Sequence, residues 1–245
     1  MQFRVWKASA AGWHQWQIGG LIRRCRVYQE PQQAVVLDGG GVIGDTLMTD
    51  RSGWGNTLHI AGGGVPNGGQ AVAADTCGAA VGRDRYLWVS GSPSLADLGE
   101  KLTMCVWVYP EAATGQGLVD IFTNGDTHVL QIGGGGSTLT FFAGGWGRGD
   151  CTVDLPANWL HHWHYLSGVC DTDGLTVYID GQWRRHTPLE KGVHLFGGDN
   201  TWMLGRNEEF PGQRIFEGRV DRPMIVQEAL DAGTIHALYL SGVDK

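Results

Sequence analysis

The segment of residues 163–186, WHYLSGVCDTDGLTVYIDGQWRRH, constrains the fold of this chain more than any other part. It contains two Asp-Gly pairs, Asp173-Gly174 and Asp180-Gly181, and glycine readily takes the positive φ that tight hairpin turns need. Between the pairs, every second residue from 175 to 179 is aliphatic, a period typical of a strand with one buried face. The segment therefore predicts an antiparallel meander, which must belong to a larger sheet because isolated hairpins are marginal in water.

Strand and turn signals recur at about ten-residue spacing along much of the chain. Residues 102–108 form a near-continuous apolar run, which is typical of a strand covered on both faces. The 40 glycines cluster at turns without the triplet period of collagen, and a hydrophobic content of 42% is enough for a core. The pattern predicts an all-β sandwich or barrel. We expect further strands at residues 117–122, 128–132, 138–143, 201–204 and 219–226.

Two segments differ from this pattern. Near the C-terminus, Asp231 is a suitable N-cap for a short helix on which Ile235, Leu238 and Tyr239 share one face. This is the only helix that the sequence predicts. Within residues 1–35, polar and apolar side chains alternate as they do in half-exposed strands. The segment predicts either extra strands of the main fold or a small arm that docks elsewhere.

Charge and hydropathy exclude some classes of partner. The formal net charge is −7 at pH 7, and basic residues gather only in the pairs Arg23-Arg24 and Arg184-Arg185, so we expect no nucleic-acid partner. No window has the roughly 18 apolar residues of a membrane span, and residues 1–6 lack the apolar stretch of a secretory signal. Three locations stay open: the cytosol, export after removal of a signal, or export as part of something larger.

The cysteines indicate neither a disulfide framework nor a structural zinc site, because they are odd in number and lack the C-x-x-C spacing. They are Cys25, Cys77, Cys105, Cys151 and Cys170. Cys105 and Cys170 lie in apolar strands, where a thiol acts as a small hydrophobic group. One disulfide that involves Cys77 and Cys151 remains open.

Catalytic constellations are missing from the sequence. Retaining glycoside hydrolysis needs two carboxylates about 5 Å apart, whereas the adjacent Glu208 and Glu209 would face opposite sides of a strand. A G-x-S-x-G nucleophile elbow is absent as well. His162 and His164 would share one strand face without a third ligand, so exposed histidines are expected instead of a zinc site. The sequence therefore predicts a protein that is not an enzyme.

Seven short motifs follow one another in a recognisable order. They are DRSGWGN at 50–56, DRYLWV with SPSL within 84–95, LTMCVWVYP at 102–110, WHYLSGVCD at 163–171, LTVYIDG at 175–181, GRVDRPMIVQEAL at 218–230 and IHALY at 235–239. Over residues 36–245 the series resembles the bacterial laminin-G-like domain, a concanavalin A-like lectin/glucanase. The resemblance implies a concanavalin A-like jelly-roll β-sandwich of two antiparallel sheets with one short C-terminal helix. Residues 1–35 lie outside it and are predicted as an N-terminal β segment or arm.

The resemblance also implies a metal site. Such domains often bind calcium through an acidic residue of the second motif and the aspartate of the sixth, which correspond here to Asp84 and Asp221. Calcium takes six to eight oxygen ligands, so backbone carbonyls and water would complete the shell. Arg85 and Arg222 stand where the family pattern has acidic residues, and they are alternative partners for the two carboxylates. A calcium ion and two ion pairs therefore remain alternative interpretations.

The tryptophans divide into two groups. By the resemblance, Trp107 and Trp163 occupy core positions of the family. Trp54, Trp146 and Trp183 lie in or beside glycine-rich turns, and an exposed indole face can stack on the apolar face of a sugar ring. These three are the candidate ligand-binding residues.

The resemblance and the motifs together predict a non-catalytic carbohydrate-binding or adhesion module, whose partner is a glycan or polysaccharide. Because a fold does not fix a function, a second hypothesis stands beside it. The chain would then be a structural subunit of a larger assembly, such as a tail or capsid-decoration protein of a phage virion, and would contact other subunits. Either role predicts an extracellular or virion-surface location. A polysaccharide-cleaving enzyme is the third hypothesis, with the least support.

Overall fold

The computed structural model describes residues 4–9, 12–17, 35–43, 46–62, 78–113, 117–189, 194–197 and 200–243. The chain forms two units, Met1–Gln32 and Gln33–Lys245. In the first, β1 (Arg4–Ser9) and β2 (Gly12–Gln17) pair as an antiparallel hairpin. This hairpin lies within the N-terminal segment that the sequence predicts at residues 1–35.

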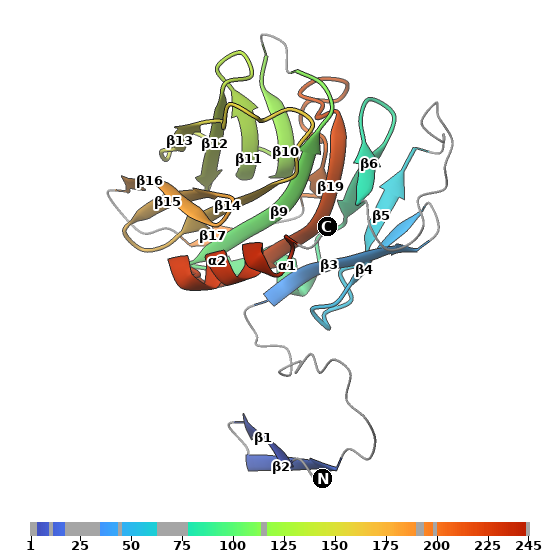
Figure 1. Cartoon of the computed structure of the whole chain (residues 1–245), viewed down its shortest axis with the longest axis vertical. Helices are drawn as coiled ribbons and strands as arrows, with labels where there is room; N and C mark the ends of the chain where they lie inside the picture. Colours follow the sequence, from blue (N-terminus) through green and yellow to red (C-terminus); the bar gives the residue numbers. More distant parts are fainter. Residues whose placement is uncertain are drawn as a thin grey trace. The chain divides into compact units, whose positions relative to one another are not determined.

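In the second unit, fourteen described strands are joined edge to edge in one sheet (Figure 1). The order begins with β13 (Cys151–Asp154), β12 (Thr138–Ala143), β11 (His128–Gly133), β10 (Val119–Asn124) and β18 (Trp202–Leu204). It continues with β7 (Tyr86–Val89), β5 (Leu58–Ala61), β4 (Leu47–Asp50) and β3 (Val35–Ile43). It ends with β19 (Gly218–Val226), β9 (Leu102–Pro110), β14 (His164–Cys170), β15 (Gly174–Ile179) and β16 (Gln182–Pro188).

The sheet folds back on itself, so that its two ends form facing layers. The continuity comes from β3, which pairs with β19 on one side and with β4 on the other. Across the interior, β12 and β13 contact β15 and β16, and Gly168 of β14 lies directly against the ring of Phe141 of β12. The predicted all-β, antiparallel fold is confirmed. The two predicted antiparallel sheets are not distinct sheets, because β3 joins both layers into one near-closed sheet.

Smaller elements complete the unit. The short strand β6 (Ala79–Val81) pairs with β19, and β8 (Asp97–Gly99) pairs with β17 (Leu195–Phe196). The C-terminal helix α2 (Ala232–Leu240) begins as predicted, since the Asp231 carboxylate accepts the backbone N–H of Thr234 at 2.8 Å. A second helix that the sequence did not indicate, α1 (Pro93–Ala96), makes one turn within the SPSL motif. No helix in the described part of the chain is both long and apolar enough to cross a bilayer.

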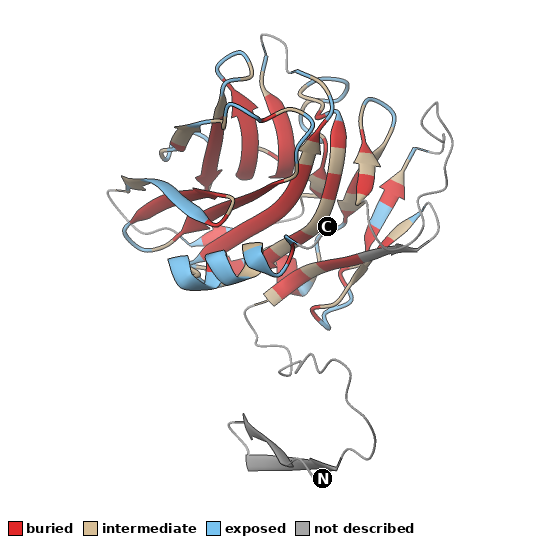
Figure 2. Ribbon diagram, viewed as in Figure 1, coloured by how far each residue is buried: buried red, intermediate tan, exposed pale blue. Residues whose placement is uncertain are grey.

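The core fills the space between the layers, and most interior strands are buried along their whole length (Figure 2). A second, smaller cluster lies on the other face of β9, β14 and β15, where Ile235 of α2 covers Trp107, Tyr165 and Tyr178. Trp107 is buried as predicted, whereas Trp163 is only partly buried against this cluster. Helix α2 therefore seals the sheet face that does not meet the opposite layer.

The meander at residues 163–186 contains the predicted strands β14, β15 and β16, but its two Asp-Gly pairs differ. Asp180 and Gly181 have φ of 55° and 68°, as a tight two-residue hairpin turn requires. The φ of Gly174, by contrast, lies outside the left-handed region. There a Cβ would come within 2.5 Å of the His186 ring, so glycine is needed for a close approach.

The described cysteines are free and buried, and they are Cys105, Cys151 and Cys170. The expected hydrophobic role of Cys105 and Cys170 agrees with their burial in β9 and β14. Burial raises the pKa of Cys170 to about 12, which keeps this thiol protonated and unreactive at neutral pH. Cys151 is a free thiol at the start of β13 and does not form the disulfide left open by the sequence; Cys25 and Cys77 lie outside the described residues.

Candidate functional site

The outer face of β10, β11, β12 and β13 carries a row of polar side chains. Successive side chains on a strand point to opposite faces, and Phe141 points toward β14, so the adjacent Thr140 points outward. The strand register places Thr140 between Gln131 and Thr152, and it places Asp120 beside Gln131. These four side chains, one from each strand, are called the polar row below.

The polar row contains hydrogen-bond acceptors that the described residues do not satisfy. At one end, the Thr140 and Thr152 hydroxyls lie 2.8 Å apart, and the Thr152 hydroxyl donates to the Asp150 carboxylate at 2.7 Å. Gln131 Oε1 and both carboxylate oxygens of Asp120 are buried and have no hydrogen-bond partner among the described residues. An unpaired buried acceptor costs free energy, and because these oxygens are buried they are not in direct reach of a ligand, unlike the half-buried Thr152 at the other end of the row.

Trp146 lies on this same face. Its ring packs edge-on against Phe142, at a centroid distance of 5.4 Å, and Phe142 is two residues from Thr140 and so points outward with it. The indole is nevertheless 66% exposed. It stands on a loop in which Gly144, Gly145, Gly147 and Gly149 all have positive φ, which only glycine adopts easily.

Backbone hydrogen bonds fix the Trp146 loop to the tip of the β10–β11 hairpin. The N–H of Trp146 donates to the carbonyl of Asp126 at 3.2 Å, and the N–H of Gly145 donates to the carbonyl of Thr127 at 2.8 Å. The N–H of Asp126 in turn donates to the Glu209 carboxylate at 3.1 Å. Asp126 thus joins the exposed indole to an acidic side chain on a separate loop.

Asp126 also belongs to a partly buried ionic network. One nitrogen of Arg214, Nη1, lies 3.0 Å from the Asp126 carboxylate and 3.7 Å from that of the buried Asp120. Asn207 donates to the same Asp126 oxygen at 3.0 Å. Burial raises the pKa of Asp120 to about 6, although Asn207 and the positive charge of Arg214 oppose the shift. A carboxyl group therefore titrates near neutrality close to the candidate site.

His128 is hydrogen-bonded to the first residue of the Trp146 loop. Burial lowers the pKa of His128 to about 4, so its ring is neutral at physiological pH. Nδ1 accepts the N–H of Gly144 at 3.3 Å, which places the proton on Nε2, and Nε2 donates to the carbonyl of Phe196 at 3.0 Å. The ring also stacks on Trp202, at a centroid distance of 5.7 Å and an interplanar angle of 5°. His128 thus connects the loop of the exposed indole to the core.

The two other predicted ligand-binding tryptophans lie on different elements. Trp183, 59% exposed, is on the edge strand β16, and Trp54, 46% exposed, follows β4. All three predicted tryptophans are therefore exposed, but they stand on three separate elements. Trp146 packs on Phe142, which lies on the outer face two residues from Thr140, so the candidate site is assigned to it.

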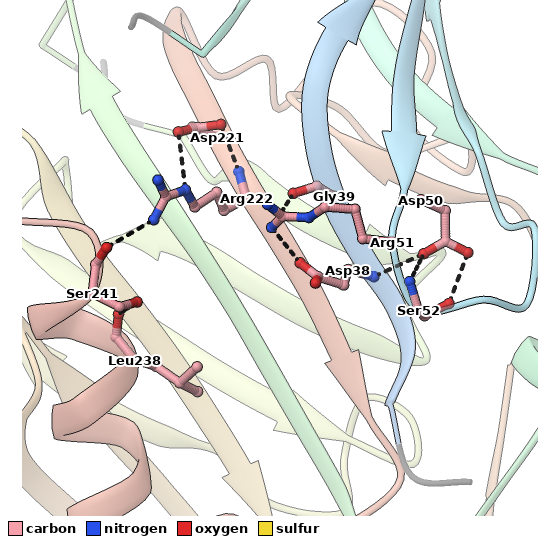
Figure 3. A network of polar contacts seen from close by, with 9 residues as sticks. All are labelled: Asp38, Gly39, Asp50, Arg51, Ser52, Asp221, Arg222, Leu238 and Ser241. Carbon is pink, nitrogen blue, oxygen red and sulfur yellow. Dashed lines mark hydrogen bonds and ion pairs between the residues drawn. The ribbon is translucent and has the colours of Figure 1, made fainter. Parts of the chain in front are cut away.

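Hydrogen bonds to the Asp50 carboxylate hold the loop that carries Trp54. The carboxylate of Asp50 accepts the N–H groups of Asp38 and Ser52 at 3.0 and 2.9 Å and the Ser52 hydroxyl at 2.8 Å (Figure 3). It also accepts the N–H of Asn56 at 2.7 Å. Four hydrogen bonds satisfy this carboxylate. The first motif of the family series therefore holds a turn in place.

The structure does not bring the two predicted calcium ligands together. Asp221 lies at one end of the β6–β19 pairing, next to Gly78, whereas Asp84 belongs to the turn beyond the other end of β6. Asp221 also faces Arg222, whose N–H donates to it at 2.9 Å and whose guanidinium lies 4.0 Å away (Figure 3). In the described part of the chain, no group of three His, Cys, Asp or Glu side chains could hold a metal ion. The pair does not fit a shared calcium ion, and the ion-pair alternative describes Asp221.

We expect calcium to leave the stability unchanged. Adding about 1 mM calcium, at the weak end of extracellular calcium sites, should not shift the melting temperature relative to a chelator-treated sample. Differential scanning fluorimetry measures this. A calcium-dependent rise that Asp221→Asn abolishes would show that the ion binds there despite Arg222.

The acidic residues weighed for catalysis serve as backbone acceptors. Glu208 accepts the N–H of Thr201 at 2.7 Å, and Glu209 accepts the N–H of Asp126. The expectation that His164 is exposed is wrong. His164 is buried because its ring stacks on Trp159 at 5.1 Å and its Nδ1 donates to the Asp180 carboxylate at 2.9 Å.

The polar row was not found from the sequence, although part of its signal was present. The strands predicted at residues 128–132 and 138–143 contain Gln131 and Thr140, each a polar residue with an apolar residue on either side. Alternation alone predicts an outward face. It does not show that residues of four strands align, which depends on register.

Comparison with solved structures identifies the same fold in proteins of low sequence identity. The binding domain of botulinum neurotoxin DC, in complex with rat synaptotagmin II, is 14% identical, with a TM-score of 0.62 over 86% of this chain and 52% of that one. A structure of botulinum neurotoxin type C, whose cell entry depends on two ganglioside molecules, is 13% identical, with a TM-score of 0.61 over 86% and 52%. The chain thus spans about half the length of these toxin structures.

A smaller protein matches over most of its own length. Domain 4 of AbnA, an extracellular arabinanase from Geobacillus stearothermophilus, in complex with arabinotriose, is 19% identical, with a TM-score of 0.54 over 78% of this chain and 92% of that one. Comparison with curated proteins finds no match. A family model described as the concanavalin A-like lectin/glucanases superfamily matches residues 82–236, which confirms the resemblance over most of the motif series. The chain therefore belongs to the concanavalin A-like lectin/glucanases superfamily.

Proposed function

We propose that this protein is a non-catalytic carbohydrate-binding module whose ligand stacks on Trp146. The observation that carries the proposal is an indole that is 66% exposed while the loop beneath it is held by backbone hydrogen bonds. Such an indole offers an apolar platform to a sugar ring at little ordering cost. Thr152 and Asp150 on one side, and Glu209 on the other, supply partners for sugar hydroxyls.

The solved structures of similar fold support a glycan over other small ligands. The arabinanase domain was obtained with arabinotriose, and the type C neurotoxin depends on gangliosides for cell entry. Glycan recognition is therefore compatible with this scaffold. Since these proteins are less than 20% identical to the chain, they favour a ligand class without specifying the sugar.

A binding panel with matched tryptophan variants tests the proposal. We expect the wild-type chain to bind at least one glycan in a panel of arabino-oligosaccharides, ganglioside headgroups and other oligosaccharides. Trp146→Ala should weaken that binding more than about tenfold, because central aromatic anchors carry most of the binding energy. Its free energy of unfolding should change by less than about 1 kcal/mol, since the side chain is mostly exposed.

Trp183→Ala is the matched control, because Trp183 is similarly exposed at 59% but lies on β16 and not on the loop that packs against Phe142. It should bind as the wild type does. Equal loss in both variants would move the site away from the polar row. An absence of binding throughout the panel would instead favour the structural-subunit hypothesis.

A further inference from the structure

A closed loop, residues 205–216, is attached at both ends to β10. The N–H of Gly205 donates to the carbonyl of Ile121, and the N–H of Asp120 donates to the carbonyl of Arg214, each at 2.8 Å. The loop closes on itself where the N–H of Phe216 donates to the carbonyl of Gly205 at 3.0 Å. Arg214 has a φ of 50°, a backbone strain that the surrounding contacts must hold. The loop is also held to its surroundings by side-chain hydrogen bonds, among them those of Asn207 to Gly125 and Asp126, so its closed form depends on several contacts around one strained residue.

Asp120 lies under this loop, where burial disfavours the negative charge of its ionised carboxylate. Two charged groups face it: Arg214 from the loop, with Nη1 3.7 Å from Asp120 Oδ2, and Asp126 from the hairpin tip. From β11 the uncharged Gln131 stands beside it in register. Neither oxygen of the Asp120 carboxylate has a hydrogen-bond partner among the described residues, so its ionised form is poorly stabilised while the loop is closed.

We propose that residues 205–216 form a proton-controlled latch beneath the Trp146 site, closed when Asp120 is protonated and loosened when Asp120 is ionised. The direction follows from linkage. Burial raises the pKa of Asp120 from an ordinary 3.8 to about 6, so the closed form binds the proton more tightly than an open, hydrated form would. The closed form is most favoured at acid pH, loses stability as the pH rises between these values, and changes no further above about 6.

The latch is connected to the candidate site through Asp126. Arg214 and Asn207 of the loop both hold its carboxylate at 3.0 Å, while its carbonyl accepts the N–H of Trp146. Loosening the loop removes two partners from the residue that positions the indole. The effect on ligand affinity thus rests on the proposed function, whereas the opening of the loop does not.

Hydrogen exchange of the whole chain, read by mass spectrometry and corrected for intrinsic rates, tests the latch without a ligand. Between about pH 5 and about pH 8, the protection of peptides covering 205–216 and 120–127 should fall by about tenfold, with most of the fall below about pH 6. Asp120→Asn should keep the same protection throughout this range, because the amide does not titrate. Asp154→Asn, which neutralises an exposed carboxylate on the terminal strand β13 of the same sheet, should retain the wild-type profile.

Protection of the β14–β15 peptides, residues 164–179, is the internal reference and should stay constant. Constant protection of the loop in the wild type would overturn the latch. So would the same pH dependence in Asp120→Asn, or a parallel fall in the β14–β15 peptides, which would indicate global unfolding. Loss of the loop response in Asp120→Asn, in a chain that binds no glycan, would uphold the latch and reject only its functional role.

Discussion

Replacing Trp202 with alanine is expected to lower the free energy of unfolding by about 3–5 kcal/mol. The side chain is fully buried on β18, where its ring stacks on His128 and meets Phe122 edge-on at 5.8 Å. Its removal leaves a cavity that neighbouring strands of a continuous sheet cannot close. Urea unfolding measures the change, with the slope of the transition confirming that unfolding remains two-state.

Trp202→Phe separates the stability lost with packing volume from any stability lost with an indole hydrogen bond. Because the indole nitrogen of Trp202 has no hydrogen-bond partner among the described residues, phenylalanine should lose packing only and cost about 1–2 kcal/mol. Trp183→Ala, on an exposed edge strand, should cost less than about 1 kcal/mol. If Trp183→Ala were as damaging as Trp202→Ala, burial would not explain the difference between the two tryptophans.

The second large effect concerns Asp180, whose replacement by alanine is expected to cost about 2–4 kcal/mol. Its carboxylate accepts the N–H of Tyr165 at 2.9 Å and that of the buried His164 ring at 2.9 Å. Alanine would leave both donors unpaired. It would also hold a φ of 55° poorly, a conformation that aspartate tolerates better than alanine does.

Asp173→Ala is the matched control, since it changes the other Asp-Gly pair of the same meander. Asp173 is exposed, and we expect a cost below about 1 kcal/mol by thermal or urea unfolding. Asp180→Asn should fall between the two, because the amide keeps one acceptor and favours the turn. Equal costs for Asp173→Ala and Asp180→Ala would mean that the turns, and not the contacts of Asp180, determine stability.

The Asp-Gly pairs at residues 173–174 and 180–181 also show how much of the fold the sequence predicts. Both indicated a turn, and both turns exist, because the preference of Asp-Gly for a chain reversal is local. The expected difference in their contribution to stability depends on His164 and Tyr165 of β14, which the fold brings to Asp180. The continuity of the sheet escaped prediction for a related reason. The pairing of β3 with β19 joins segments far apart in the chain, and hydrophobic periodicity carries no information on such partners.

The candidate site was predictable only in part. Trp146 stood out because a large aromatic residue among glycines has few neighbours to cover it, and its exposure agrees with that argument. Exposure alone does not distinguish it from Trp54 and Trp183. What does distinguish it is the alignment of Asp120 with Gln131 and the residues beyond it, and one change of register would turn these side chains to the interior.

The near closure of the sheet bears on self-association. A sheet with free edges exposes unpaired N–H and C=O groups, to which strands of other molecules can add. Here the two terminal strands meet each other: the Cys151 thiol donates to the carbonyl of Arg185, and the Arg185 guanidinium donates to the carbonyl of Thr152. Arg184 and Arg185 add positive charge along the edge strand β16. The contacts between the terminal strands and this charge both disfavour the addition of a strand from another chain. The sheet of a glycine-rich chain is thereby protected against strand-to-strand aggregation at its own margins.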